Sequence, residues 1–214
     1  KFLFFPIIQK DQDFRLLLEN ALPVSKILED TYHLEGRQVL LFVGRLIDIK
    51  NLFFLLDALA LVVNRYPKVI LLFVGDGDQR VALERHAERN GLADHVIFAG
   101  KKQGEDLYAC YNVGQIFILP SYYERFGAVV NEALLAGCYT LCSVVAGAAC
   151  LIEPQKNGDL FDPASKTYLA EKLAQSLKDC EGLKQISLKA NKMCYSYDQY
   201  ITSFFNQLNS IIDK

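Results

Sequence analysis

Glu124 and Glu132 are the acidic residues of a stretch in which a strand-like run gives way to a helix. Residues 115–119 before Glu124 are largely apolar, and residues 133–136 after Glu132 are apolar at helical spacing. In open α/β sheets such turns lie at the carboxyl ends of the strands, where ligands bind. The unpaired N–H groups and partial positive charge of a helix start suit a phosphate. We therefore expect an anion site between the two glutamates.

The two carboxylates are unsuited to phosphate but suited to hydroxyl groups, because a carboxylate accepts hydrogen bonds from O–H donors. If the helix begins near Phe126, Glu132 lies about two turns into it, roughly 9 Å along its axis. Gly127 removes a Cβ where the backbone must approach the ligand. The pattern predicts a ligand with a central diphosphate and hydroxyl-rich groups at both ends, which is the shape of a nucleotide-sugar.

Two alternatives remain open for this stretch. Glu124 could merely favour the helix N-terminus electrostatically while Glu132 lies on a solvated face. Separated pairs of carboxylates also occur in glycoside hydrolases. The phosphate-binding turn between Glu124 and Glu132 favours nucleotide-sugar chemistry over hydrolysis.

A second loop adds positive charge at the end of another predicted strand. Residues 39–43 form an uninterrupted apolar run that ends at Gly44, and Arg45 and Lys50 follow it. An arginine presents a planar fork of donors and a lysine a point charge, which is the pair expected for a diphosphate. A salt-bridged surface loop is the alternative, and the residues alone favour neither interpretation.

A third turn contains Gly75, Asp76, Gly77 and Asp78. A dinucleotide fingerprint would need a glycine or alanine five positions after Gly75, where an arginine stands. Asp76 and Asp78 also have the spacing of a metal-binding pair. We interpret the glycines as the turn into the next helix and Asp78 as its N-cap.

Apolar runs alternate with helix-length segments from residue 38 onward. Strands that are apolar throughout and separated by helices indicate a parallel sheet covered on both faces and wound with right-handed crossovers. We therefore predict an α/β, Rossmann-like, doubly wound domain with a helical C-terminal tail. Strands are expected at residues 39–43, 69–74, 96–98, 115–119 and 139–143, with a short one at 158–161, and helices at 52–63, 79–89 and 105–111.

The chain is predicted to have three parts. Residues 1–37 are interpreted as a linker or interdomain segment with a short helix at 23–32. Residues 38–198 form the Rossmann-like domain, in which Ser165 begins a capped amphipathic helix. Residues 199–214 form a final helix with a strong apolar stripe. The tail from Ser165 is expected to hold two or three helices.

Composition narrows the function classes. A net charge of −2 and a pI near 6.0 argue against a nucleic-acid partner. No apolar run reaches the length of a membrane span. The six cysteines lack C-x-x-C spacing and indicate reduced thiols of a cytosolic protein rather than a disulfide framework or a zinc site.

Several stretches together resemble a known family. Glu124 and Glu132, with Pro120 and Ser121 before them and Phe126 next to Gly127 between them, resemble the E-x7-E signature of the retaining family 4 (group 1) glycosyltransferases of GT-B fold. Other stretches match in the right order over residues 38–180. Residues 145–152 depart from the family's Gly-Gly-x-Pro-Glu loop, with Ala146, Ala149 and Cys150 at the first Gly, the Pro and the Glu. That departure puts the usual hydrogen bonding of this loop in doubt.

The resemblance implies a role for each candidate residue. Arg45 and Lys50 would hold the donor diphosphate, Glu124 the sugar hydroxyls and Glu132 the ribose diol. The backbone of Phe126 and Gly127 would contact the sugar or phosphate, and the loop at Gly100 and Lys101 the nucleobase. Gly44 and Gly75 complete the donor site, and Glu124, Arg45 and Lys50 are the catalytic candidates.

By the same resemblance, the chain is the donor-binding half of a hexosyltransferase-like enzyme of polysaccharide or glycolipid synthesis. A missing N-terminal domain would hold a saccharide or lipid-linked acceptor, and the chain starts with Lys1, which suggests a piece of a longer protein. GT-B enzymes use cationic side chains and helix dipoles, so no metal or other cofactor is expected. The location expected is cytoplasmic, which allows peripheral association at the inner face of the membrane.

Two other functions remain as alternatives. One is a non-catalytic nucleotide-binding or regulatory module. The other is half of a nicotinamide-dependent dehydrogenase, which the broken glycine fingerprint after Gly75 disfavours.

Overall fold

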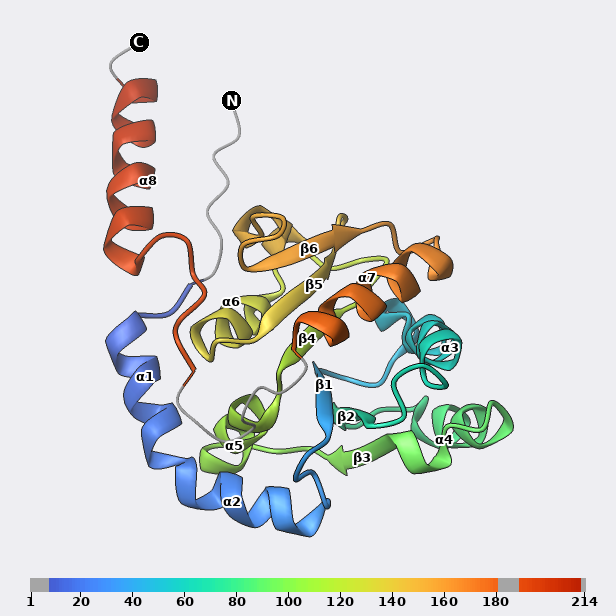
Figure 1. Ribbon diagram of the computed structural model, residues 1–214. Helices are drawn as coiled ribbons and strands as arrows, with labels where there is room; N and C mark the ends of the chain where they lie inside the picture. Colours follow the sequence, from blue (N-terminus) through green and yellow to red (C-terminus); the bar gives the residue numbers. More distant parts are fainter. Residues whose placement is uncertain (1–7, 181–188, 213–214) are drawn as a thin grey trace.

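The computed structural model describes residues 8–180 and 189–212. At its centre is a six-stranded sheet in the order β3-β2-β1-β4-β5-β6, in which every pairing is parallel (Figure 1). This order confirms the predicted doubly wound sheet, since the chain starts in the middle and extends first to one edge and then to the other. The strands are β1 (Gln38–Val43), β2 (Val69–Val74), β3 (Val96–Gly100), β4 (Ile116–Leu119), β5 (Tyr139–Ser143) and β6 (Gly158–Phe161).

Helices cover both faces of the sheet, and each face has its own apolar core. One face carries α1 (Asp11–Asn20), α2 (Leu22–Thr31), α5 (Glu105–Val113) and α6 (Ala128–Leu135). The other carries α3 (Leu52–Val62), α4 (Arg80–Arg89) and α7 (Lys166–Asp179). Short 3-10 turns are η1 (Asp48–Lys50), η2 (Ala93–His95) and η3 (Gly147–Leu151).

The two cores explain why the strands lack a polar face. Along β1, Val39 and Leu41 belong to one core, whereas Leu40 and Phe42 belong to the other. Successive side chains of a strand point to opposite faces, so a strand covered on both sides is apolar at every position. This burial holds the carboxyl ends of the strands, and the loops that follow them, in fixed relative positions.

The described part of the N-terminal segment is helical and packs on the domain, where the sequence favours a linker over residues 1–37. Phe14 and Leu18 of α1 are buried, and the ring of Phe14 lies 5.5 Å from that of Tyr108 in α5. The predicted helix at 23–32 is confirmed as α2. The apolar run at residues 2–6 lies outside the described residues, and the domain boundaries stay a prediction.

Of two predicted helix caps, the one at Asp78 is wrong and the one at Ser165 is correct in position only. Helix α4 begins at Arg80 with Gln79 at the N-cap, so Asp78 lies one position too early to cap it. Asp76 instead accepts a hydrogen bond from the N–H of Gly77, at 2.8 Å, within the turn. Ser165 does occupy the N-cap of α7, but its hydroxyl makes no capping hydrogen bond.

The tail contains α7 and α8 (Tyr197–Ile212) among the described residues. Helix α8 stands out from the body of the domain in Figure 1. Its N-terminus is tied to the start of α1, because the N–H of Tyr197 donates to Asp11 at 3.1 Å. In the described part of the chain, no helix combines the length and the apolar character that crossing a membrane requires.

Candidate functional site

The carboxyl ends of β1, β2 and β3 are joined by glycine backbones. The N–H of Gly44 donates to the carbonyl of Val74, and the N–H of Gly75 donates to that of Gly100, both at 2.9 Å. Gly75 has φ +142°, and a Cβ there would overlap the carbonyl oxygen of Gly44. The turns predicted from sequence therefore meet at one edge of the sheet.

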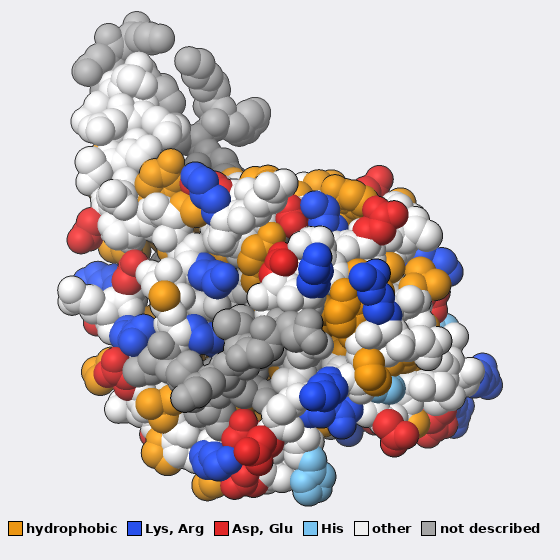
Figure 2. Space-filling model, in the orientation of Figure 1, with side chains coloured by type: hydrophobic (Ala, Val, Ile, Leu, Met, Phe, Trp, Pro, Cys, Tyr) orange, Lys and Arg blue, Asp and Glu red, His pale blue; other side chains and the backbone are white. Residues whose placement is uncertain are grey.

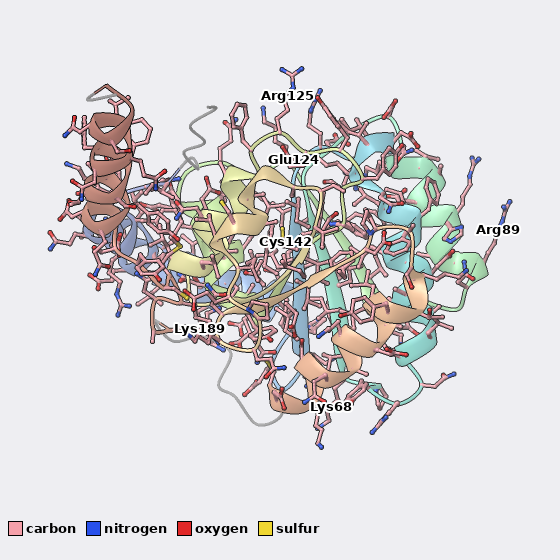
Figure 3. The ribbon with its side chains drawn as sticks, turned by 90° about the horizontal axis from the view of Figure 1, so that it is seen from above. Lys68, Arg89, Glu124, Arg125, Cys142 and Lys189 are labelled. Atoms are coloured by element: carbon pink, nitrogen blue, oxygen red, sulfur yellow. The ribbon has the colours of Figure 1, made fainter. Side chains whose placement is uncertain are left out.

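Glu124 lies at the same edge. In Figure 3 Glu124 and Arg125 lie at one side of the domain, opposite Lys68, which directly precedes β2. The positions confirm that residues 120–127 follow the carboxyl end of β4, as predicted. All three candidate loops thus surround one region.

The loop after β1 and the loop after β4 are bonded to each other. Lys50 donates from Nζ to Oε2 of Glu124. Next to this pair, the N–H of Tyr122 donates to the carbonyl of Ile49 at 3.2 Å, and the hydroxyl of Tyr122 donates to Asp48. The bond to Asp48 raises the pKa of Tyr122. Two residues predicted separately as site residues are therefore in direct contact.

The two predicted cations differ in their surroundings. The side chains of Lys50 and Glu124 are only 15% and 16% exposed, so their pair differs from an ordinary surface salt bridge. Arg45, at the same strand end, is exposed, and its side chain has no hydrogen bond or ion pair with the described residues. It is available for an anion approaching from solvent.

Helix α6 begins beside Glu124 but later than predicted. Gly127 is its N-cap residue in the left-handed conformation, with φ +76°, and α6 runs from Ala128 instead of starting near Phe126. Glu132 is therefore about one turn into the helix, roughly 6 Å along its axis, rather than two. Among the described residues, no side chain caps this N-terminus. Its first N–H groups can face an anion.

Glu132 is half-buried and its carboxylate is bonded to two neighbouring side chains, so the alternative that it lies on a solvated face is wrong. Its Oε2 accepts a hydrogen bond from the hydroxyl of Tyr111 at 2.6 Å, and its Oε1 accepts one from Nε2 of Gln9 at 3.1 Å. Burial raises the pKa of Glu132 above its ordinary value, although both hydrogen bonds act to lower it. Burial also raises the pKa of Tyr111, with a further contribution from Glu132.

Sequence reasoning missed Tyr111 and Gln9 as partners of Glu132. Tyr111 is a fully buried residue of α5, and Gln9 lies in the segment interpreted as a linker. Nothing in the spacing of either residue indicates the contact.

The loop that departs from the family pattern still supports Glu124 through its backbone. The N–H of Gly147 donates to the carbonyl of Glu124 at 3.0 Å. A Cβ at Gly147 would overlap the carbonyl oxygen of Arg125. Cys150 is exposed and free. The substitutions at Ala146, Ala149 and Cys150 thus leave the contact between the two loops in place.

The remaining candidates lie around the same edge. Gly100 ends β3 with φ +72°, and Lys101 follows it with an exposed side chain. Phe126 is 52% exposed, directly before the start of α6. Backbone and side-chain groups from four strand ends therefore border the region.

The described residues contain no group of three or more His, Cys, Asp or Glu side chains that could hold a metal ion. Asp76 and Asp78 are both exposed in the turn after β2. Of the six free cysteines, Cys110, Cys138, Cys142 and Cys180 are buried. The positive charge identified at this site comes from Arg45, Lys50, Lys101 and the start of α6.

Comparisons with known proteins agree with this architecture. The family model described as "Glycosyl transferases group 1" matches residues 25–193. An uncharacterized glycosyltransferase of Methanocaldococcus jannaschii is 30% identical over 161 residues, which cover 75% of this chain and 41% of that protein. The chain spans about two fifths of the length of the first curated relatives it matches.

Two solved structures share the fold. The C-terminal domain of a glycosyl transferase group 1 family protein (LpcC) from Francisella tularensis superimposes with a TM-score of 0.66 at 20% identity, covering 94% of this chain and 96% of that one. Anabaena HepE in complex with UDP gives a TM-score of 0.69 at 24% identity, covering 88% of this chain and 52% of HepE. The match therefore corresponds to the C-terminal half of such proteins.

Proposed function

Since this chain belongs to the group 1 glycosyltransferases, we propose that it is the half that binds a nucleotide-diphosphate sugar for transfer with retention of anomeric configuration. The observation that carries the proposal is the meeting of Lys50, Glu124 and the start of α6 at one sheet edge. Arg45 follows the same strand as Lys50. This edge combines groups that bind a diphosphate with carboxylates that bind hydroxyls.

Each part of the ligand has a matching group. Arg45 and Lys50 bind the diphosphate, together with the first N–H groups of α6. Glu124 accepts hydrogen bonds from the sugar hydroxyls. Glu132 binds the ribose diol: a carboxylate has about four acceptor positions, and Tyr111 and Gln9 occupy two of them.

The same groups support the chemistry. When the glycosidic bond breaks, negative charge develops on the departing diphosphate, and Arg45 and Lys50 stabilise it. Glu124 holds the sugar beside this leaving group. We assign these three residues as the catalytic residues. The proposed reaction requires no metal.

The nucleobase and acceptor complete the proposal. The loop at Gly100 and Lys101 contacts the base, and HepE, which has the same fold, was solved with UDP and with UDP and glucose. Uracil is therefore the first base to test. A saccharide or lipid-linked acceptor is assigned to a further domain, at the cytoplasmic side.

Calorimetric titration tests the proposal with UDP, GDP and ADP against NAD, first with a chelator and then with magnesium or manganese added. We expect one nucleoside diphosphate to bind. Arg45→Ala should weaken it by on the order of 1.5–3 kcal/mol, the value of a lost charge-assisted contact, and leave the bare nucleoside unaffected. Glu132→Ala should weaken both the diphosphate and the nucleoside.

Arg89→Ala is the matched control, because Arg89 is an exposed arginine at the end of α4 that points away from the site in Figure 3. It should leave binding unchanged. Absence of heat with all three diphosphates at millimolar concentration would reject the proposal. Preferential binding of NAD would favour the dehydrogenase alternative, and a requirement for magnesium or manganese would favour a metal site at Asp76 and Asp78.

A further inference from the structure

Lys50 and Glu124 are bonded to each other, although the proposed function assigns them to different parts of the ligand. Lys50 is assigned to the diphosphate and Glu124 to the sugar. The pair spans two loops and both side chains are mostly buried, at 15% and 16% exposed. The only other hydrogen bond recorded for the Glu124 carboxylate in the described residues is a long one of 3.4 Å from the N–H of Phe126. Lys50 is therefore the main bonding partner of this carboxylate.

The loops hold this pair in place. Tyr122 bonds to Ile49 through its N–H and to Asp48 through its hydroxyl, which ties the loop of Glu124 to that of Lys50. On the other side, Gly147 donates to the carbonyl of Glu124. The carboxylate is therefore anchored at both sides of its loop and remains close to any phosphate that Lys50 binds.

A nucleoside diphosphate and a nucleotide-sugar meet this pair differently. The terminal phosphate of the free diphosphate carries an additional negative charge and competes with Glu124 for Lys50. A mostly buried carboxylate that loses its cation is costly, and two anions held close together repel each other. In a nucleotide-sugar that phosphate is a diester with less charge, and the sugar supplies O–H donors to Glu124.

We propose that Glu124, through its ion pair with Lys50, makes the site discriminate against the nucleoside diphosphate and in favour of the sugar-bearing donor. The inference rests on the proposed function and deepens it. Its consequence is that the diphosphate product, which lacks the sugar hydroxyls, is held weakly and leaves after transfer. Glu124 is then a specificity-determining residue as well as one that contacts the sugar.

Glu124→Gln tests the inference, because glutamine has nearly the same shape without the charge. UDP should bind the variant more tightly, with a Kd lower by about fivefold or more, since Lys50 is released and the repulsion is removed. UDP-glucose should gain less or lose affinity. The Kd of UDP divided by the Kd of UDP-glucose should therefore fall in the variant. Glu124→Ala should change UDP binding in the same direction, and melting temperatures verify that the variants fold.

Glu19→Gln is the matched control, because it removes the carboxylate of the exposed Arg15–Glu19 pair on α1. Its UDP affinity should equal that of the unmodified protein. Unchanged or weaker UDP binding in Glu124→Gln would overturn the inference, and weaker binding would show that Glu124 instead positions Lys50 for phosphate. If the unmodified chain binds GDP or ADP in place of UDP, the same comparison applies with that base. If it binds no nucleoside diphosphate, the proposed function itself fails.

Discussion

At the scale of single residues, Glu132 is a half-buried carboxylate that is also a candidate ligand-binding group. Tyr111 and Gln9 each donate one hydrogen bond to it, yet burial dominates and raises its pKa. A buried carboxylate that is only partly compensated costs stability. Active sites commonly retain such groups because function requires them. Glu132 should therefore be destabilising at neutral pH, and its proposed role in binding the ribose would explain why it is retained.

The raised pKa predicts how stability depends on pH. When the folded pKa lies above the unfolded one, the unfolded chain loses its proton first as pH rises above about 4.5. The free energy of unfolding therefore decreases as pH rises from the unfolded pKa to the folded pKa of Glu132, and it levels off above the folded pKa. Glu132→Gln has no proton to lose, so its free energy of unfolding should improve relative to the unmodified chain between pH 4 and pH 8.

Urea unfolding at both pH values measures this difference, with Glu19→Gln as the control for removing an exposed carboxylate. A difference between Glu132→Gln and the unmodified chain that stayed constant with pH would contradict the prediction. The Glu132→Gln variant should also bind the bare nucleoside more weakly. Stability and binding would then change in opposite directions.

Residue types and spacing predicted that Glu124, Arg45 and Lys50 lie in loops that follow strands, and the structure places them there. Tyr111 could not be identified in this way. Its hydroxyl reaches Glu132 only because α5 and α6 pack on the same face of the sheet. Such a contact depends on how the helices pack in the folded chain, which the local spacing of residues does not predict.

At the scale of elements, the strands and several helix starts were predictable, since α3 and α5 begin at the predicted residues 52 and 105, whereas the starts of α4 and α6 were not. The strand β2 is buried on both sides, so every one of its side chains must be apolar. An uninterrupted apolar run in the sequence therefore predicts such a strand. A cap depends on the last few dihedral angles of a turn, so Asp78 and Gln79 are hard to distinguish by sequence. The site depends on the strand ends, whose positions are set by the sheet.

The glycine at the end of β2 provides a test at this scale. Gly75→Ala places a Cβ onto the backbone of Gly44 and also strains a positive φ. We expect a loss of roughly 3 kcal/mol or more in the free energy of unfolding, or weakened diphosphate binding where the loops move apart to relieve the overlap.

Gly91→Ala is its control, because Gly91 has φ +69° with no atom within 4 Å of an added Cβ. It shares the strain of a positive φ without the overlap, so it should cost about 1–2 kcal/mol and leave binding unchanged. Denaturant unfolding and calorimetry on both variants make the comparison. Equal losses in the two variants would show that the close approach of Gly75 to Gly44 has no energetic role.

At the scale of the whole molecule, the chain forms a complete sheet with two cores. On the face shown in Figure 2, Lys and Arg side chains are interspersed with Asp and Glu, without a broad area of one sign. Helix α8 differs from the rest: it stands out from the body (Figure 1), and Phe205 on it is 53% exposed. Exposed apolar side chains of this size commonly mark contact with a partner.

The last prediction is that the 214-residue chain should bind donor but not transfer sugar efficiently. The chain spans about two fifths of the length of its first curated relatives, and an isolated C-terminal group 1 domain matches it over 96% of its length. Positioning both reactants supplies much of the rate of a two-substrate reaction, so a domain that holds only the donor lacks that contribution. Turnover of radiolabelled nucleotide-sugars, with lipid and saccharide acceptors added, measures it. Slow hydrolysis fits the prediction, whereas efficient transfer to an added acceptor would show that this chain holds both substrates.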